Sequence, residues 1–136
     1  MAASIISDGL DTSFKAWMSY KAITNTSSVQ YELQQDAWTD DNGLRRYNKD
    51  YMVAVGTPYG NVGDRIKITL DTGEVFNAII GDSKGDRYYH SCSKGANVVE
   101  FIVDTKALDS EAKKMGDISY IPFFEGEVID IQKLDG

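Results

Sequence analysis

The amino-acid sequence predicts a mainly β fold, a small closed or nearly closed barrel with one or two short helices at its periphery. The chain has 136 residues, of which 42% are hydrophobic and 11% aromatic, and this is enough apolar material for one compact domain. From residue 51 onward, short apolar or alternating segments are separated by glycine-containing turns, which is the pattern of successive strands. Such short strands need their edges covered, and closure of five or six of them into a barrel provides that cover.

The region before residue 50 is polar and predicts one helix and one strand. Val29, Tyr31 and Leu33 alternate with polar residues, which is typical of a half-buried strand. The run TDDNG at 39–43 predicts a loop. Four apolar residues at helical spacing predict a short N-terminal helix that packs on the core: Leu10, Phe14, Trp17 and Met18.

The next segments predict a strand followed by a β-hairpin. The run YMVAV at 51–55 is a short apolar strand that ends in the turn residues GTPYG at 56–60. The run RIKITL at 65–70 alternates strictly between apolar and polar side chains. The tight turn DTG then leads into EVFNAII at 74–80, so these two runs predict an antiparallel pair.

A long loop and two further strands follow. Residues 81–96 hold three glycines among charged and polar residues, which predicts a loop. The run NVVEFIV at 97–103 is dense in β-branched and aromatic residues, and EVIDIQKL at 127–134 alternates, so each predicts a strand. The second of them would close the barrel.

A short helix is expected between these last two strands, over residues 105–115. Asp104 or Thr105 would cap its N-terminus, and Gly116 would end it in a left-handed conformation. We therefore expect a single domain over residues 1–136 in three parts: a helix and strand region at 1–49, the barrel core at 50–104, and the helix and closing strand at 105–136.

The charge of the chain argues against nucleic acid as its main partner. There are 14 Lys and Arg against 21 Asp and Glu, which gives a formal net charge of −7. Binding to a polyanion depends on clustered basic side chains that neutralise phosphates. Arg45, Arg46 and Lys49 form a small basic group, which we interpret as a solvated loop.

The cysteine and histidine content predicts no cofactor and no metal site. Cys92 is a single cysteine and His90 a single histidine, so neither an intrachain disulfide nor a zinc motif can be assembled. The two residues also give no reason to expect a nucleophilic Cys–His pair. Four acids could offer oxygen ligands to Ca²⁺ without matching an EF-hand loop: Asp82, Asp86, Glu100 and Asp104.

Targeting signals are not evident in the chain. The start MAASIISDGLDTSF lacks the basic and apolar regions of a signal peptide. No stretch has the roughly 18 consecutive apolar residues expected of a membrane span. If the protein acts outside the cell, we expect a larger parent chain, a holin-type route or a virion to deliver it.

Asp82 is the first candidate functional residue, because it follows the apolar run that contains Ile79 and Ile80. A carboxyl group desolvated at a strand end can serve as a general acid near neutral pH. The alternative is that Asp82 caps a turn by accepting backbone N–H groups. Both interpretations remain open on residue spacing alone.

Glu100 is the second candidate, because it lies in the middle of an apolar strand and shares a face with Val98 and Ile102. Either that face is exposed, or the carboxylate is buried and requires a partner such as Lys84. An aromatic group could also line a sugar-binding groove or be ordinary surface packing: Trp17, Trp38, Tyr59, Tyr88 and Tyr89.

The order of these features resembles the double-psi β-barrel, here six-stranded, of the three-aspartate (3D) domain. That domain is related to the barrels of membrane-bound lytic transglycosylase A, rare lipoprotein A and expansin. Asp82 matches the aspartate of the family's "DtG" step, with Ser83 for threonine and Lys84 for glycine, and Glu100 falls on the aspartate of "riDly". Gly56 stands where the family has its first aspartate. The segments that carry the resemblance are 51–56, 63–70, 78–83 and 97–103.

The resemblance implies a lytic transglycosylase that cleaves the bond between N-acetylmuramic acid and N-acetylglucosamine in peptidoglycan. A single barrel aspartate acts there first as acid and then as base, which makes Asp82 the implied catalytic residue. Glu100 would assist it. The residues implied to orient the acid or contact the glycan are Lys84, Asp86, Tyr59, Tyr88 and Thr24, the last matching a threonine near the start of such barrels.

The resemblance also leaves a second function class open. Expansin-like barrels do not require hydrolysis, so the chain could instead bind wall glycan without cleaving it, or form part of a tail or surface assembly. In both cases the implied partner is the peptidoglycan glycan strand. The implied location is outside the cell, at the cell wall or on a virion.

Overall fold

The computed structural model describes residues 3–4, 15–84 and 98–134, and these form a mainly β structure. Nine strands of the described chain belong to one mixed sheet, accompanied by the helices α1 (Val29–Gln35) and α3 (Ser110–Met115). The strands are β1 (Ala3–Ser4), β2 (Trp17–Ser19), β3 (Trp38–Thr39), β4 (Arg45–Tyr47), β5 (Asp50–Val55), β6 (Arg65–Leu70), β7 (Val75–Ser83), β8 (Glu100–Val103) and β9 (Val128–Lys133). Single 3₁₀ turns cover Tyr20–Ala22, Thr57–Tyr59, Ile118–Tyr120 and Pro122–Phe124.

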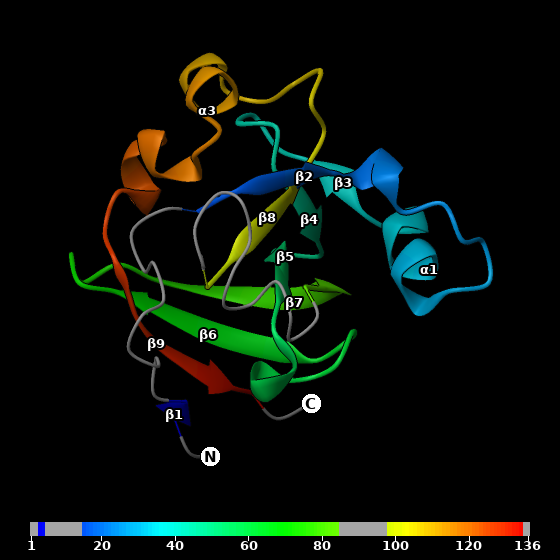
Figure 1. The fold of residues 1–136 in the computed structure, drawn as a ribbon, viewed down its shortest axis with the longest axis horizontal. Coiled ribbons are helices and arrows are strands. Elements are labelled where there is room, and N and C mark those ends of the chain that lie inside the picture. The colour runs from blue at the N-terminus through cyan, green and yellow to red at the C-terminus, as the bar shows by residue number, and fades with distance from the viewer. Residues whose placement is uncertain (1–2, 5–14, 85–97, 135–136) are drawn as a thin grey trace.

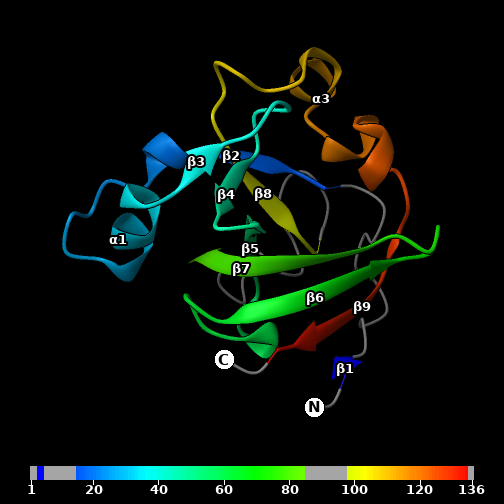
Figure 2. The ribbon, with the colours of Figure 1, turned by 180° about the vertical axis from the view of Figure 1, so that it is seen from behind.

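The sheet topology centres on β5. The main path runs β1-β9-β6-β7-β5-β4-β3, and β8 joins it by pairing with both β5 and β2. β5 is parallel to β7 but antiparallel to β8 and β4, while β2 is parallel to β8. In both views the β6–β7–β9 layer lies below β2, β8 and β4, and α1 lies beside the end of β7 (Figures 1 and 2). The predicted mainly β fold is thus confirmed.

The core lies between these layers and is rich in aromatic rings. Tyr51, Phe76, Phe101 and Phe124 contact one another, with ring centroids 4.9 to 6.3 Å apart in their pairs. Most of these ring pairs are edge-to-face, which is a favourable arrangement for aromatic quadrupoles. Phe101 is fully buried, so β8 holds the centre of the cluster.

The strand predictions from residue 51 onward are largely confirmed. The apolar positions of β6 are buried while its polar positions are half-buried, as strict alternation requires. β6 and β7 pair as an antiparallel hairpin, and β9 pairs with β6 as the last described strand. β7 extends to Ser83, and β8 begins at Glu100 rather than at residue 97. The segment 39–43 connects β3 and β4 as predicted, with the Asp40 carboxylate accepting the backbone N–H of Leu44.

The predicted strand around Tyr31 is wrong, because residues Val29–Gln35 form α1. The Ser28 hydroxyl caps this helix by accepting the backbone N–H of Tyr31. Glutamine, glutamate and leucine, which follow, are good helix formers, and Leu33 packs against the second core cluster. The alternation of Val29, Tyr31 and Leu33 therefore does not mark a strand, because these residues belong to a short amphipathic helix.

The predicted N-terminal helix is contradicted where it can be compared. Trp17 and Met18 lie in the strand β2, which pairs with β8, and so they are not helical. Pairing with β8 satisfies their backbone groups, which outweighs the helical spacing of their side chains. Leu10 and Phe14 lie outside the described residues.

The helix expected at 105–115 is shorter than predicted and begins at Ser110. Its cap is Asp109, whose carboxylate accepts the backbone N–H of Ala112. The Asp104 carboxylate instead accepts the backbone N–H of Lys106 and so stabilises a turn before the helix. Gly116 ends the helix in the left-handed region at φ 70°, as predicted.

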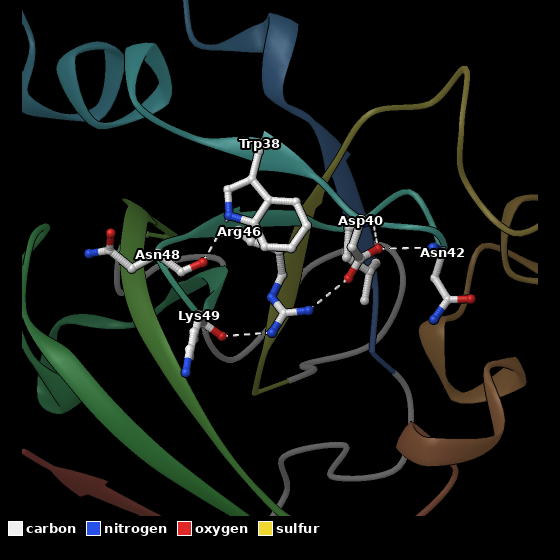
Figure 3. A network of polar contacts seen from close by, with 7 residues as sticks. Trp38, Asp40, Asn42, Arg46, Asn48 and Lys49 are labelled. Atoms are coloured by element: carbon white, nitrogen blue, oxygen red, sulfur yellow. Dashed lines mark hydrogen bonds and ion pairs between the residues drawn. The ribbon is translucent and has the colours of Figure 1, made fainter.

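The basic group at residues 45–49 does not form a solvated loop. Arg45 and Arg46 belong to β4, and Arg45 is buried. The Arg46 guanidinium donates to the Asp40 carboxylate at 3.0 Å and to the Lys49 carbonyl at 2.7 Å (Figure 3). It also lies 3.8 Å from the ring centroid of Tyr51. Both arginines therefore stabilise the β3–β4–β5 region.

Asp64 gives the fold a defined response to acid. Its carboxylate accepts the backbone N–H of Asn61 at 2.9 Å and pairs with Lys133 at 3.2 Å, so β9 is joined to the turn before β6. The backbone hydrogen bond from Asn61, assisted by Lys133, lowers the pKa of Asp64 below its usual 3.8. A lowered folded-state pKa adds stability above the unfolded pKa, and that stability is lost as the pH falls through the folded value.

We expect Asp64→Asn to be less stable than the wild type at pH 7 and to approach it in acid. The free energy of unfolding should be measured in urea at intervals from about pH 6 to about pH 2, because the contribution of Asp64 to stability is lost as the pH falls below its unfolded-state pKa. Asp71→Asn is a suitable second variant for comparison, because the wild-type Asp71 carboxylate also accepts a backbone N–H, that of Glu127. A stability difference between Asp64→Asn and wild type that stays constant across the range would contradict this role.

Candidate functional site

The two carboxylates predicted to be functional lie on either side of one alanine. Ala54 of β5 pairs with Asp82 of β7 on one side and with Glu100 of β8 on the other. Directly paired residues in a sheet point to the same face, so both acids share the face of Ala54. Two strand spacings separate their Cα atoms by about 10 Å. The topology, with β5 between β7 and β8, therefore brings Asp82 and Glu100 to one part of the sheet.

A β-bulge places Asp82 at this position. The register of β5 with β7 shifts between Val53 and Ala54, so that Gly81 is the extra residue of β7. A Cβ atom at Gly81 would lie 2.7 Å from Ile102, which excludes a side chain there without movement. Glycine at this bulge thus leaves room for the Ile102 side chain beside the carboxylate that follows.

Asp82 lines a polar pocket of about 230 Å³. Its Oδ1 accepts the backbone N–H of Ser83 at 2.9 Å and the side-chain amide of Gln30, from α1, at 3.4 Å. Thr24, the threonine predicted to be near the substrate, lines the same pocket and is exposed. The structure therefore brings Asp82 and Thr24 together. The full lining is Ala22, Ile23, Thr24, Asn25, Ser28, Gln30 and Asp82.

Glu100 is half-buried and is paired with Lys84. The Lys84 side chain is almost fully buried, with its Nζ 3.5 Å from Glu100 Oε1. This agrees with the alternative in which a buried glutamate requires Lys84 as a partner. Glu100 lines a separate pocket of about 380 Å³, together with Trp17 and Lys113. The two acids thus open to different pockets.

The other predicted site residues do not join this group. Tyr59 is only 3% exposed and packs in the main core, so its ring does not face a solvent-filled groove. Asp86 and Tyr88 lie outside the described residues, as do His90 and Cys92. Of the predicted set, Asp82, Thr24, Lys84 and Glu100 remain as the candidate site.

Sequence reasoning missed the polar residues that α1 and its preceding turn bring to Asp82. Gln30 donates to the carboxylate, and Asn25 and Ser28 line the pocket. The signal that could have found them is Ser28 followed by a run of helix formers, which marks a capped helix. Reading that run as a strand left no reason to place Gln30 near the acid.

Over residues 15–84 and 98–134, no helix has the length and apolarity to cross a membrane. Among the described side chains, no group of three or more His, Cys, Asp or Glu is placed to hold a metal ion.

Comparison of the chain with protein-family models, with curated proteins and with solved structures found no significant match.

Proposed function

We propose that the chain is a lytic transglycosylase-like module that cleaves the bond between N-acetylmuramic acid and N-acetylglucosamine in peptidoglycan. The observation that carries the proposal is the pocket of Asp82, in which, among residues 15–84 and 98–134, this carboxylate is accompanied by neutral side chains such as Thr24 and Gln30. Hydroxyl and amide groups are suited to a hydroxyl-rich glycan. Asp82 is the single carboxylate among the described lining residues, which favours a reaction that uses one acid rather than two.

The reaction needs one group that first gives and then takes a proton. Protonated Asp82 donates its proton to the glycosidic oxygen as the bond from that oxygen to C1 of N-acetylmuramic acid breaks. The C6 hydroxyl oxygen of the same sugar attacks C1, and its proton returns to the Asp82 carboxylate. The products are a free hydroxyl on N-acetylglucosamine and a 1,6-anhydro ring. No water enters, in contrast to glycosidases that use a pair of carboxylates.

The separation of Asp82 from Glu100 supports this one-acid chemistry. Glu100 lines another pocket, and its carboxylate is paired with Lys84 at 3.5 Å, whereas the Asp82 carboxylate accepts only neutral N–H donors among the described contacts. We propose that Lys84 and Glu100 position the ends of β7 and β8 around the site. Asp86 and Tyr88 remain proposed glycan contacts from the segment that joins these two strands.

The arrangement of strands is compatible with the proposed double-psi barrel. Six strands follow one another as paired neighbours in the order β9-β6-β7-β5-β8-β2, and two of the pairs, β5 with β7 and β2 with β8, are parallel. Closure of this series into a six-stranded barrel is part of the proposal. The family resemblance also motivates the proposed location at the cell wall or on a virion, within a larger chain or assembly.

The test is digestion of purified peptidoglycan followed by mass spectrometry of the soluble fragments. We expect 1,6-anhydromuropeptides, which are lighter by one water than the products of hydrolysis. Hydrolysed fragments would indicate a glycosidase that uses water instead. Absence of any fragment would overturn the catalytic proposal.

A noncatalytic wall-binding or structural barrel is the second candidate. It is favoured by the bond from the Ser83 N–H to the Asp82 carboxylate, which is also the bond of a structural turn. For this function we expect the chain to sediment with insoluble peptidoglycan and to release no fragments from it.

A further inference from the structure

A second pocket adjoins the pocket of Asp82. It has a volume of about 320 Å³ and lies between the 3₁₀ turn Tyr20–Ala22 and α1. Ile23 and Thr24 line both pockets, so this short segment forms the boundary between them. A ligand longer than one ring could therefore occupy both. The lining residues are Tyr20, Lys21, Ile23, Thr24, Thr26, Tyr31, Gln34 and Gln35.

The inner wall of this second pocket is fixed by Arg45. The Arg45 guanidinium lies 4.2 Å from the ring centroid of Tyr20. It also donates to the Gln34 side chain at 2.9 Å and to the Gln34 carbonyl at 3.1 Å. The side-chain amide nitrogen of Gln34 donates to the Met52 sulfur at 3.3 Å, so Gln34 is held from two sides. Side chains locked in this way lose little entropy when a ligand binds.

The ring of Tyr20 retains a surface toward the pocket. Tyr20 is half-buried and lines the pocket, whereas Arg45, which contacts its ring, is buried and does not line the pocket. Tyr31 is half-buried in the first turns of α1 and adds a second ring. Two rings supply apolar contact area without much side-chain entropy.

The polar groups around these rings are mostly neutral. Thr24, Thr26 and Gln35 are exposed and provide hydroxyl and amide groups. Among the described lining residues Lys21 is the one charged side chain, although the chain carries a net charge of −7. Aromatic surface beside neutral hydrogen-bonding groups fits a pyranose ring, which has an apolar face and a rim of hydroxyls. A single lysine in an acidic chain does not provide the clustered charge that a nucleic acid requires.

We propose that the Tyr20–Tyr31 pocket is a saccharide subsite, which holds a sugar unit next to the one bound at Asp82. The proposal rests on the proposed function in one respect, namely that the glycan strand runs from this pocket past Asp82. Binding of a sugar in the pocket does not itself require cleavage. Thr24 would contact both sugars, since it lines both pockets. Tyr31 supplies the ring contact that can be removed with least effect on the fold, because alanine is a good helix former.

The experiment measures binding separately from cleavage. The full-length Asp82→Asn chain is titrated with a soluble β-1,4-linked tetramer of N-acetylglucosamine by calorimetry, with and without Tyr31→Ala. We expect Tyr31→Ala to raise the dissociation constant by about ten-fold, as loss of a central aromatic contact does. Tyr31→Phe should retain most of the affinity. Tyr120→Ala is the matched control, since Tyr120 is an exposed tyrosine outside both pockets.

The possible outcomes distinguish the subsite from the reaction. Unchanged affinity in Tyr31→Ala, or equal losses in Tyr31→Ala and Tyr120→Ala, would overturn the subsite, as would no binding by the Asp82→Asn chain. Wild-type cleavage of peptidoglycan could still stand in each of these cases. Conversely, affinity that depends on Tyr31 in a chain that releases no fragments would support the subsite and overturn the catalytic proposal. Circular dichroism of each variant checks that α1 remains folded.

Discussion

Asp82→Asn is expected to abolish the release of 1,6-anhydromuropeptides from peptidoglycan, with a loss of about 10²- to 10⁴-fold in rate. The amide has nearly the shape of the acid and its oxygen can still accept the Ser83 N–H, so the end of β7 should be preserved. The amide cannot donate a proton to the glycosidic oxygen and recover one from the C6 hydroxyl. The rate is measured from the mass-spectrometric yield of anhydro fragments over time.

Two comparisons make this result specific to Asp82. Glu100→Gln removes the other carboxylate of the same sheet face, and we expect a smaller loss because Glu100 opens to a different pocket. Asp71→Asn changes a carboxylate in the β6–β7 turn and should leave the rate unchanged. If Asp82→Asn retained full activity while Glu100→Gln lost it, the assignment of the acid would be wrong.

Phe101→Ala is expected to destabilise the protein by about 3–5 kcal/mol, the usual range for removing a fully buried aromatic ring. Phe101 is fully buried, and its ring lies 4.9 Å from that of Phe124 and 5.9 Å from that of Phe76. The cavity would open at the centre of the cluster, where three strands and the turn before β9 meet. Urea unfolding at pH 7 measures the change.

Phe123→Ala provides the control for this core substitution. Phe123 neighbours Phe124 in the chain and contacts its ring at 4.9 Å, but Phe123 is 36% exposed. Its loss should therefore cost much less than the loss of Phe101. Equal costs for the two substitutions would mean that the aromatic cluster does not govern stability.

Much of the strand pattern could be predicted from the sequence, because burial on one face imposes strict alternation. The run 65–70 alternates over its whole length, and the structure buries its apolar side as expected. The N-terminal third could not be predicted in the same way. Residues 29–35 are too few for either period to be distinctive, and Trp17 is in a strand only because β8 lies beside it.

The candidate site was predicted only in part. Asp82 could be singled out because it follows an apolar strand, and the Lys84–Glu100 pair was one of the stated alternatives. The neighbours of Asp82 could not be predicted from the sequence, since Thr24 and Gln30 reach it through the packing of α1 against β7. Tyr59 was predicted to contact sugar because it is an aromatic residue in a turn, but it packs in the main core instead.

The pairing of β2 with β8 also determines when the protein can fold during its synthesis. Trp17 leaves the ribosome long before Phe101, its partner in the register. Until then β2 has no partner, and the antiparallel contact of β5 with β8 is missing as well. Contacts between distant residues form slowly because a long loop must close first. The hairpin of β6 and β7 can therefore form on the nascent chain, while the aromatic centre must wait until Phe101 and Phe124 have been synthesised.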